Sequence, residues 1–186
     1  MLNRKYPTTA EIHKAEALGL VFDKTGRVLR LCTNKNISEV AIPDGVSTIG
    51  QNMQRPAEKR LIAAIFGDYS SIYDGFCNCV KLTTVVIPGS VKKITEGAFC
   101  NCKSLRKIVI PYGVKSIGEN TFFECANLTE IDLPANITRI ENGVFSGCTS
   151  LTRITIPASV VKISNSAFKG AGCEEQVKRD YPHLFE

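Results

Sequence analysis

The sequence predicts an α/β repeat solenoid that forms one structural domain, and three observations support this prediction. A unit of 22–23 residues recurs six times between residues 37 and 170. Each unit combines a strand pattern, a proline or its replacement, and a second short apolar stretch. Helix signals stand at both ends of the chain. A fixed period of this length is typical of a solenoid, in which each coil buries its apolar face only against its neighbours.

Residues 1–36 are expected to form an N-terminal cap made of a helix and a hairpin. Thr8 stands three residues before Glu11, which is the spacing of a capping box, and Gly19 is suited to end the helix. Strand-like residues on both sides of a turn then predict a hairpin over residues 21–31. A cap is needed because the open edge of a strand ladder invites aggregation.

Four copies in the second half of the chain are nearly identical. Their L-x-x-I-x-I-P pattern places apolar residues with the two-residue period of a strand, and the proline ends the strand because it lacks an N–H. A buried V-x-x-I stretch follows, and a phenylalanine near the end of each copy supplies the large core side chain. The prolines are Pro88, Pro111, Pro134 and Pro157, and the phenylalanines are Phe99, Phe122, Phe145 and Phe168. Coils should stack about 4.8 Å apart, so that equivalent residues form ladders.

Two earlier copies and a C-terminal cap complete the predicted architecture. One copy surrounds Pro43, and a worn copy follows in which Phe66 takes the place of the proline. Phe66 lies 23 residues after Pro43 but 22 before Pro88, which indicates the loss of one residue. The repeats therefore span residues 37–170, and residues 171–186 are expected to form a cap with a short polar helix.

The recurring I-P, V-x-x-I, A-F and C-x-x-L segments resemble the BspA-like type of leucine-rich repeat. The resemblance covers residues 37–168. It implies a right-handed, curved solenoid with one parallel β-sheet along its concave side and short second strands or turns. It also implies a surface or secreted protein that binds other proteins or host-cell components, so adhesion or host interaction is the expected class of function.

The repeat explains six of the eight cysteines. Equivalent positions hold Cys79, Cys102, Cys125 and Cys148, and a second set holds Cys77 and Cys100. We expect the four-residue ladder to be buried and reduced, because parallel side chains do not face one another for a bridge. Reduced thiols and the absence of a secretory signal favour a cytoplasmic location and an intracellular scaffold for the chain as it stands. Removal of a leader would instead fit a secreted or cell-surface protein, and no apolar run approaches the length of a membrane span.

The sequence favours neither catalysis nor metal or cofactor binding. The Cys-x-Cys pairs at residues 77–79 and 100–102 have one intervening residue, whereas paired zinc ligands usually have two to four. The two histidines, His13 and His183, fall outside the repeats. No phosphate loop, nucleophile elbow or His-Glu-x-x-His pair occurs. We therefore expect a protein that is not an enzyme and that binds no metal or cofactor.

A basic stripe runs along the outward positions of the second stretch. Its members are Lys92, Lys93, Lys115, Arg139 and Lys162. One interpretation is a polyanion-binding surface for nucleic acid or an acidic glycan. The other is a solvated face that keeps the protein soluble, which we favour because exposed charges at this spacing are screened. Nucleic acid is disfavoured because aromatic residues do not alternate with the basic ones.

The outward positions of the first strands predict a surface for a protein partner. This candidate surface comprises Leu61, Ile62, Val86, Arg106, Lys107, Val109, Glu130, Asp132 and Arg153. An apolar patch bordered by charges is a common design for a protein-binding surface. In a second interpretation the worn copy shifts its register and buries Leu61 and Ile62. The favoured function is a non-catalytic module that binds a protein through its concave sheet.

Overall fold

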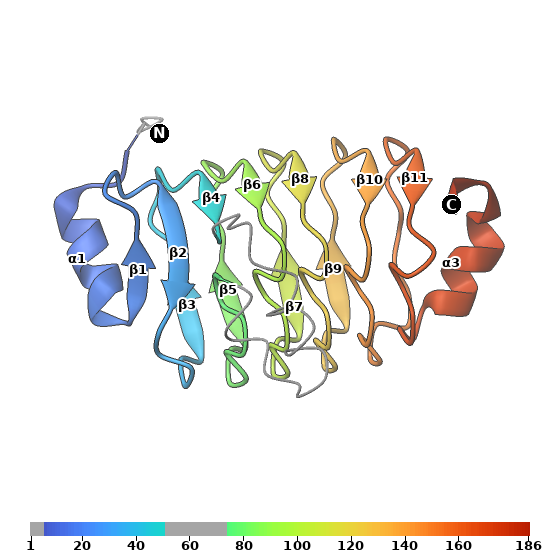
Figure 1. Ribbon diagram of the computed structural model, residues 1–186, viewed down its shortest axis with the longest axis horizontal. Helices are drawn as coiled ribbons and strands as arrows, with labels where there is room; N and C mark the ends of the chain where they lie inside the picture. The colour runs from blue at the N-terminus through green and yellow to red at the C-terminus, as the bar shows by residue number, and fades with distance from the viewer. Residues whose placement is uncertain (1–5, 51–73) are drawn as a thin grey trace, which may run out of the picture.

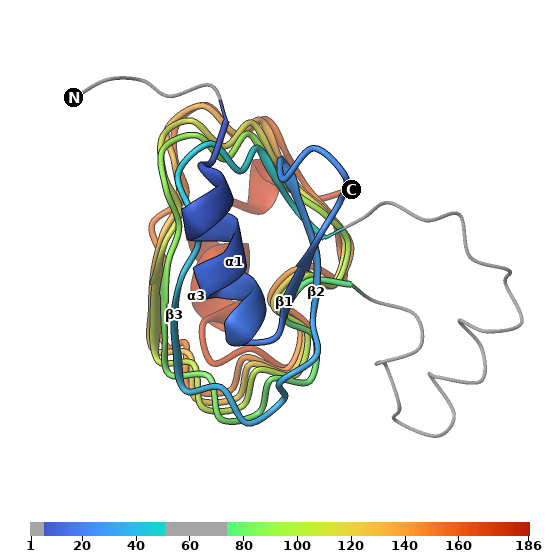
Figure 2. The same ribbon diagram turned by 90° about the vertical axis from the view of Figure 1, so that its left-hand side faces the viewer.

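The computed structural model describes residues 6–50 and 74–186. They form an elongated stack of coils with helix α1 (Thr9–Ala17) at one end and helix α3 (Glu174–Asp180) at the other (Figure 1). Along the axis of the stack the coils superpose into a flattened ring (Figure 2). The prediction of a repeat solenoid is confirmed.

The N-terminal helix begins and ends where the sequence predicts. The Thr8 hydroxyl accepts a hydrogen bond from the Glu11 N–H at 3.2 Å, and the Glu11 carboxylate accepts one from the Thr8 N–H at 2.8 Å. These reciprocal bonds form the expected capping box. After the helix, Gly19 has a φ of +88°, a left-handed conformation that glycine adopts without the steric cost of a Cβ.

The predicted hairpin follows directly. Strand β1 (Leu20–Phe22) pairs antiparallel with β2 (Val28–Cys32). The turn is held by the Asp23 carboxylate, which accepts N–H groups of Arg27 and Val28 at 3.0 and 3.1 Å. Because β2 also pairs in parallel with the first repeat, the hairpin joins the ladder of the repeats.

The second stretch of each repeat builds a ladder of very short strands on one side of the coils. Strands β1, β2, β4, β6 and β8 form one five-stranded sheet in that order, and β10 pairs with β11. The repeat strands are β4 (Thr48–Ile49), β6 (Lys93–Ile94), β8 (Ser116–Ile117), β10 (Arg139–Ile140) and β11 (Lys162–Ile163). We call this side the second-strand face.

The first strands build the opposite side of the ring, which we call the first-strand face (Figure 2). It consists of residues 152–155 and of strands β3 (Glu39–Ala41), β5 (Thr84–Val86), β7 (Lys107–Val109) and β9 (Glu130–Asp132). Strand β3 pairs with β5, and β7 with β9. The prediction of one continuous sheet on this face is therefore wrong. Strands β5 and β7 contact each other but belong to separate two-stranded sheets. Three-residue strands closed by a proline leave few groups for a continuous ladder.

The repeat count predicts a worn copy between the coil around Pro43 and the coil around Pro88. Strand β3 pairs directly with β5, and β4 pairs directly with β6, so no strand lies between these neighbours. The same coil continues at Phe76, whose ring stacks on Phe99 at 5.3 Å between centroids. The coils around Pro43 and Pro88 are therefore direct neighbours in the stack. Phe66, Leu61 and Ile62 lie outside the described residues.

Equivalent side chains form the core of the stack. Five phenylalanine rings are fully buried and stack with centroid distances of 5.2–5.7 Å: Phe76, Phe99, Phe122, Phe145 and Phe168. The expected cysteine ladder lies beside them, and all eight cysteines are buried free thiols. Three of these thiols donate to a phenylalanine carbonyl in the coil before their own, at 3.1–3.2 Å. Each coil thus satisfies a buried carbonyl of the previous one.

The C-terminal segment packs against the last coil. Val177 of α3 is fully buried, and a short 3-10 helix (Pro182–Leu184) follows. Phe185 then makes a parallel bridge to Ile163 of β11. The short polar helix that the sequence predicts within residues 171–186 is present as α3.

Candidate partner-binding surface

The first-strand face exposes the side chains that the sequence predicted to be outward. In β5, β7 and β9 the middle residue is buried and its two neighbours are exposed. Val86 and Val109 remain 57% and 53% exposed although both are large and apolar. Side chains of alternate residues point to opposite sides of a strand, so this pattern follows from the strand geometry. The described part of the candidate surface therefore lies on one side of the molecule.

A central groove of about 630 Å³ runs between β5 and β7. It is lined by residues 83–87 of one coil and residues 106–109 of the next. Val86 and Val109 supply apolar surface, while Arg106 and Lys107 are the charged side chains of the lining. The groove lies where the ladder is interrupted. An apolar hollow bordered by basic groups is suited to bind an apolar side chain of a partner.

An ion pair separates this groove from the next hollow along the face. Lys107 Nζ lies 2.6 Å from Glu130 Oε1, and the two residues are directly opposite each other in the β7–β9 pairing. The hydrogen bond to Glu130, together with the charges of Glu130 and Asp132, raises the pKa of Lys107. Both side chains are more than half exposed, so water screens the pair. The ion pair therefore marks the boundary between the basic central groove, which contains Lys107, and the next hollow, which contains Glu130.

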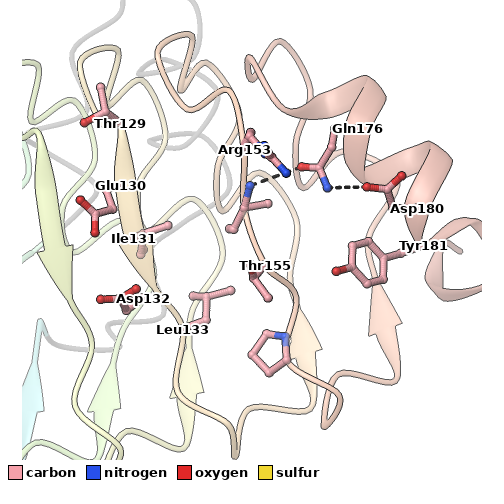
Figure 3. Close-up of a pocket in the computed structure, with 12 residues that line it drawn as sticks. Thr129, Glu130, Ile131, Asp132, Leu133, Arg153, Thr155, Gln176, Asp180 and Tyr181 are labelled. Carbon is pink, nitrogen blue, oxygen red and sulfur yellow. Dashed lines mark hydrogen bonds between the residues drawn. The ribbon is translucent and has the colours of Figure 1, made fainter.

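A second hollow of about 560 Å³ lies at the C-terminal end of the face, and we call it the terminal pocket (Figure 3). Residues 129–133, which contain β9, line one wall, and Arg153, Ile154, Thr155 and Pro157 line the middle. The opposite wall belongs to α3 and the residue after it, through Gln176, Asp180 and Tyr181. Side chains from three separate segments thus surround one space.

Gln176 holds α3 against the coil that precedes it. Its side-chain oxygen accepts the Ile154 N–H at 3.3 Å, and its side-chain nitrogen donates to Asp180 at 2.8 Å (Figure 3). The hydrogen bond from Gln176, the bond from Arg179 and the nearby charge of Arg153 lower the pKa of Asp180. The carboxylate is therefore ionised at neutral pH and has a fixed place in the pocket wall.

A third hollow, of about 320 Å³, lies at the N-terminal end of the same face. Helix α1 lines it with Glu11, Lys14 and Ala15, and the half-exposed Leu18 follows the helix. Residues 41–44 line the opposite side. The described residues of the first-strand face thus carry three hollows along the stack.

The basic stripe lies on the second-strand face, away from these hollows. Lys92, Lys93 and Lys115 are exposed there. Arg139 and Lys162 are partners in the β10–β11 pairing, but Arg139 lies 3.2 Å from Glu141 and Lys162 is paired with Glu186. Two of the five members are therefore compensated by acidic groups, which weakens the field that a polyanion would meet.

Seven of the nine predicted partner-binding residues line two of these hollows. Val86, Arg106, Lys107 and Val109 line the central groove, whereas Glu130, Asp132 and Arg153 line the terminal pocket. Leu61 and Ile62 lie outside the described residues. The sequence prediction missed Gln176, Asp180 and Tyr181, because the docking of α3 follows no repeat. The one available signal was the change from repeat to polar helix directly after the last coil.

The described parts of the chain hold no group of three or more His, Cys, Asp or Glu side chains that could ligate a metal ion. Within the same residues, no helix is long and apolar enough to cross a membrane.

Comparison with known proteins relates the chain to leucine-rich repeats. The sequence model of the BspA type leucine rich repeat region matches residues 71–178 with six copies. A leucine-rich repeat protein from Bacteroides ovatus superposes with a TM-score of 0.50 at 25% identity, covering 81% of this chain. The match takes in 41% of that protein, so this chain corresponds to less than half of its length. The leucine-rich repeat protein of T. pallidum superposes with a TM-score of 0.54 at 19% identity, over 92% of this chain and 96% of that one. A search of curated proteins finds no match.

Proposed function

Because the chain belongs to the BspA-type leucine-rich repeat family, we propose that it is a non-catalytic module that binds a protein partner through its first-strand face. Leucine-rich repeat proteins generally bind proteins, and this chain has an extended face suited to that task. The proposal includes adhesion or host interaction as its setting. It also includes right-handed coiling and a capping role for the two terminal helices, supported by the contact of α1 with β1 and by the buried Val177.

One observation carries the proposal: two large apolar side chains in neighbouring coils are exposed in the same groove. Val86 and Val109 both line the central groove and are both more than half exposed. Their burial by a partner would stabilise a complex by roughly 1–2 kcal/mol each, since apolar burial contributes about 25 cal/mol per Å². Arg106 and Lys107, both on the β7 side of the groove, would orient the partner.

The test is affinity capture followed by measurement of binding to the captured protein. Wild-type protein serves as bait, and Val109→Asp is compared with it. The aspartate would place an unpaired charge in a desolvated contact, so we expect binding to be lost. Val109 contributes little to the core, so the melting temperature should hardly change.

Val161→Asp is the matched control. Val161 is also an exposed valine, at 71%, but it directly precedes β11 of the second-strand face. We expect this variant to bind like wild type. Equal loss of binding in both variants, or retention in both, would refute binding through the first-strand face.

The polyanion interpretation has weaker support. Glu141 and Glu186 compensate two members of the basic stripe, and Lys92 Nζ donates to the Gly89 carbonyl at 3.1 Å. Lys93 and Lys115 keep exposed charges. A polyanion would lose affinity steeply with salt, whereas a partner bound by the valines would not.

A further inference from the structure

We infer that the terminal pocket accepts an arginine side chain of the protein partner. This inference rests on the proposed function, since it assigns a chemical preference to one end of the first-strand face. The pocket volume of about 560 Å³ lies within the range of about 300–1,000 Å³ that is common for ligand sites. It is therefore large enough to take a long side chain rather than only a flat contact.

The charge of the pocket favours a cation. Three carboxylates, those of Glu130, Asp132 and Asp180, line it together with one guanidinium, that of Arg153. The central groove has the opposite character, because its described lining contains two basic side chains and no acidic one. A partner that spans both hollows would complement the face best with a basic group at the terminal pocket.

The existing ion pairs show which carboxylate is available. Glu130 is paired with Lys107, and Asp180 interacts with Arg179 and with the charge of Arg153. Asp132 is exposed and forms no ion pair with any of the described residues. An incoming cation would therefore meet Asp132 as its main partner.

The opposite wall favours arginine over a small cation. Tyr181 presents a half-buried ring beside Asp180, across the pocket from β9 (Figure 3). A guanidinium can stack on an aromatic ring and can form two parallel hydrogen bonds to one carboxylate, which an ammonium cannot do. Thr129 and Thr155 add hydroxyl acceptors to the lining. A neutral apolar group would desolvate the carboxylates without compensation.

The wall that carries Tyr181 is anchored before any ligand binds. Gln176 joins the backbone of Ile154 to the carboxylate of Asp180, so the helix and the coil are held together. Gly170 N–H and Lys178 both bind Glu174 near the start of the helix, at 2.8 and 2.6 Å. Pre-organisation of this kind lowers the cost of ordering a site on binding.

The test uses N-acetyl-arginine methylamide as a probe of a peptide-borne arginine. The citrulline analogue, which has nearly the same shape and no charge, is the matched ligand. Each is titrated into the full chain while the methyl resonances of Leu133 and Thr155 are followed by NMR. We expect saturable shifts with the arginine compound, with an affinity on the order of millimolar, and none with the citrulline compound.

Two variants connect the binding to the pocket. Asp132→Asn should weaken binding of the arginine compound by about three- to fivefold, the scale of an exposed ion pair. Glu39→Gln removes an exposed carboxylate from β3 on the same face and should change nothing. Equal binding of the two ligands, no binding at all, or an unaffected Asp132→Asn variant would overturn the inference. Free arginine that binds much more tightly than the blocked compound would also overturn it, by assigning the pocket to a small molecule.

The arginine titration tests the terminal pocket independently of the capture experiment, which tests the proposed protein partner. Val109 is directly opposite Asp132 in the β7–β9 pairing, so Val109→Asp would add a charge beside the arginine site. Val86→Asp also alters the central groove, lies one coil further from Asp132, and should leave arginine binding unchanged. Arginine binding together with failure of the capture experiment would refute the proposed partner and retain the pocket. The reverse combination would refute the pocket alone.

Discussion

Each phenylalanine of the core repeats the environment of the one before it. Phe122 stacks between Phe99 and Phe145 at 5.6 and 5.7 Å, with interplanar angles of 11° and 5°. The fixed spacing of the coils keeps the rings nearly parallel, and their centroid distances lie within the range of about 4.5–7 Å that is typical of favourable aromatic pairs. A residue in the middle of the ladder therefore supports two neighbouring coils.

Phe122→Ala tests this packing. The ring is fully buried, so its removal leaves a cavity and should lower the free energy of unfolding by about 3–5 kcal/mol. Urea denaturation of wild type and variant at equal protein concentration provides the measurement. A loss below about 1 kcal/mol would show that the ladder is not the core of the stack.

Glu124 has a left-handed backbone conformation at a position where the equivalent residues of the other repeats are asparagine or glycine. Its φ is +58°, and the equivalent positions hold Asn101, Gly147 and Gly170, all with positive φ. A left-handed conformation costs a residue such as glutamate roughly 1–2 kcal/mol. Glu124→Gly should therefore raise the free energy of unfolding by about 0.5–1 kcal/mol, since part of the gain is lost to the flexibility of glycine when unfolded.

Gly147→Ala makes the reverse change at the equivalent position of the next repeat, because it adds a side chain instead of removing one. A Cβ at Gly147 would lie 2.7 Å from Glu124 Oε1, and its φ of +75° would be strained. This variant should melt at a lower temperature than wild type in calorimetry. A less stable Glu124→Gly protein would contradict the account of strain at this position.

Elements with a local signal could be predicted from the sequence. The Thr8–Glu11 capping box, the hairpin and the alternation that exposes Val86 and Val109 all follow from short-range geometry. The direct contact between the coils around Pro43 and Pro88 could not, because the 45 residues between these prolines equal the sum of two repeat lengths. The pairings of β3 with β5 and of β4 with β6 show that these coils are neighbours.

The terminal pocket was predictable on one side only. Glu130 and Asp132 alternate outward in β9 like the other strand residues, so the period places them. Gln176, Asp180 and Tyr181 depend on how α3 packs against residues 153–157, and this contact occurs once in the chain. A contact that does not repeat has no periodic signal.

The attachment of α3 should depend on pH. The hydrogen bond from Lys178 lowers the pKa of Glu174, and the bond from Gln176 lowers that of Asp180. Carboxylates with lowered folded-state pKa values stabilise the fold above their ordinary values of 4.5 and 3.8, and this contribution is lost as the pH falls through the folded values. We expect the midpoint of urea denaturation to fall as the pH is lowered from about 5 to about 3.

The double variant Glu174→Gln/Asp180→Asn isolates this effect. Neither replacement titrates, so the midpoint should fall less with pH than that of wild type over the same interval. Identical pH profiles would show that the two carboxylates do not stabilise the C-terminal helix.

The whole molecule presents two sides with different chemistry. The first-strand face combines exposed valines, a basic groove and an acidic pocket along one line. The second-strand face exposes lysines, and its C-terminal part is balanced by Glu141 and Glu186. The central groove of the first-strand face offers exposed apolar area, and apolar surface is typical of the centre of a protein interface.

The affinity of the captured partner for three forms of the protein tests the central claim most directly. Wild type, Val109→Asp and the triple reversal of Lys92, Lys93 and Lys115 to glutamate are compared at about 150 and 500 mM salt, where exposed charges are screened increasingly. Binding through the first-strand face predicts a loss of about 30-fold or more for Val109→Asp, the scale of an interface hot spot. It predicts a change within about threefold for the triple reversal, and a weak dependence of wild-type affinity on salt. A triple reversal that destroys binding while Val109→Asp preserves it, with a steep loss of wild-type affinity in high salt, would contradict the account.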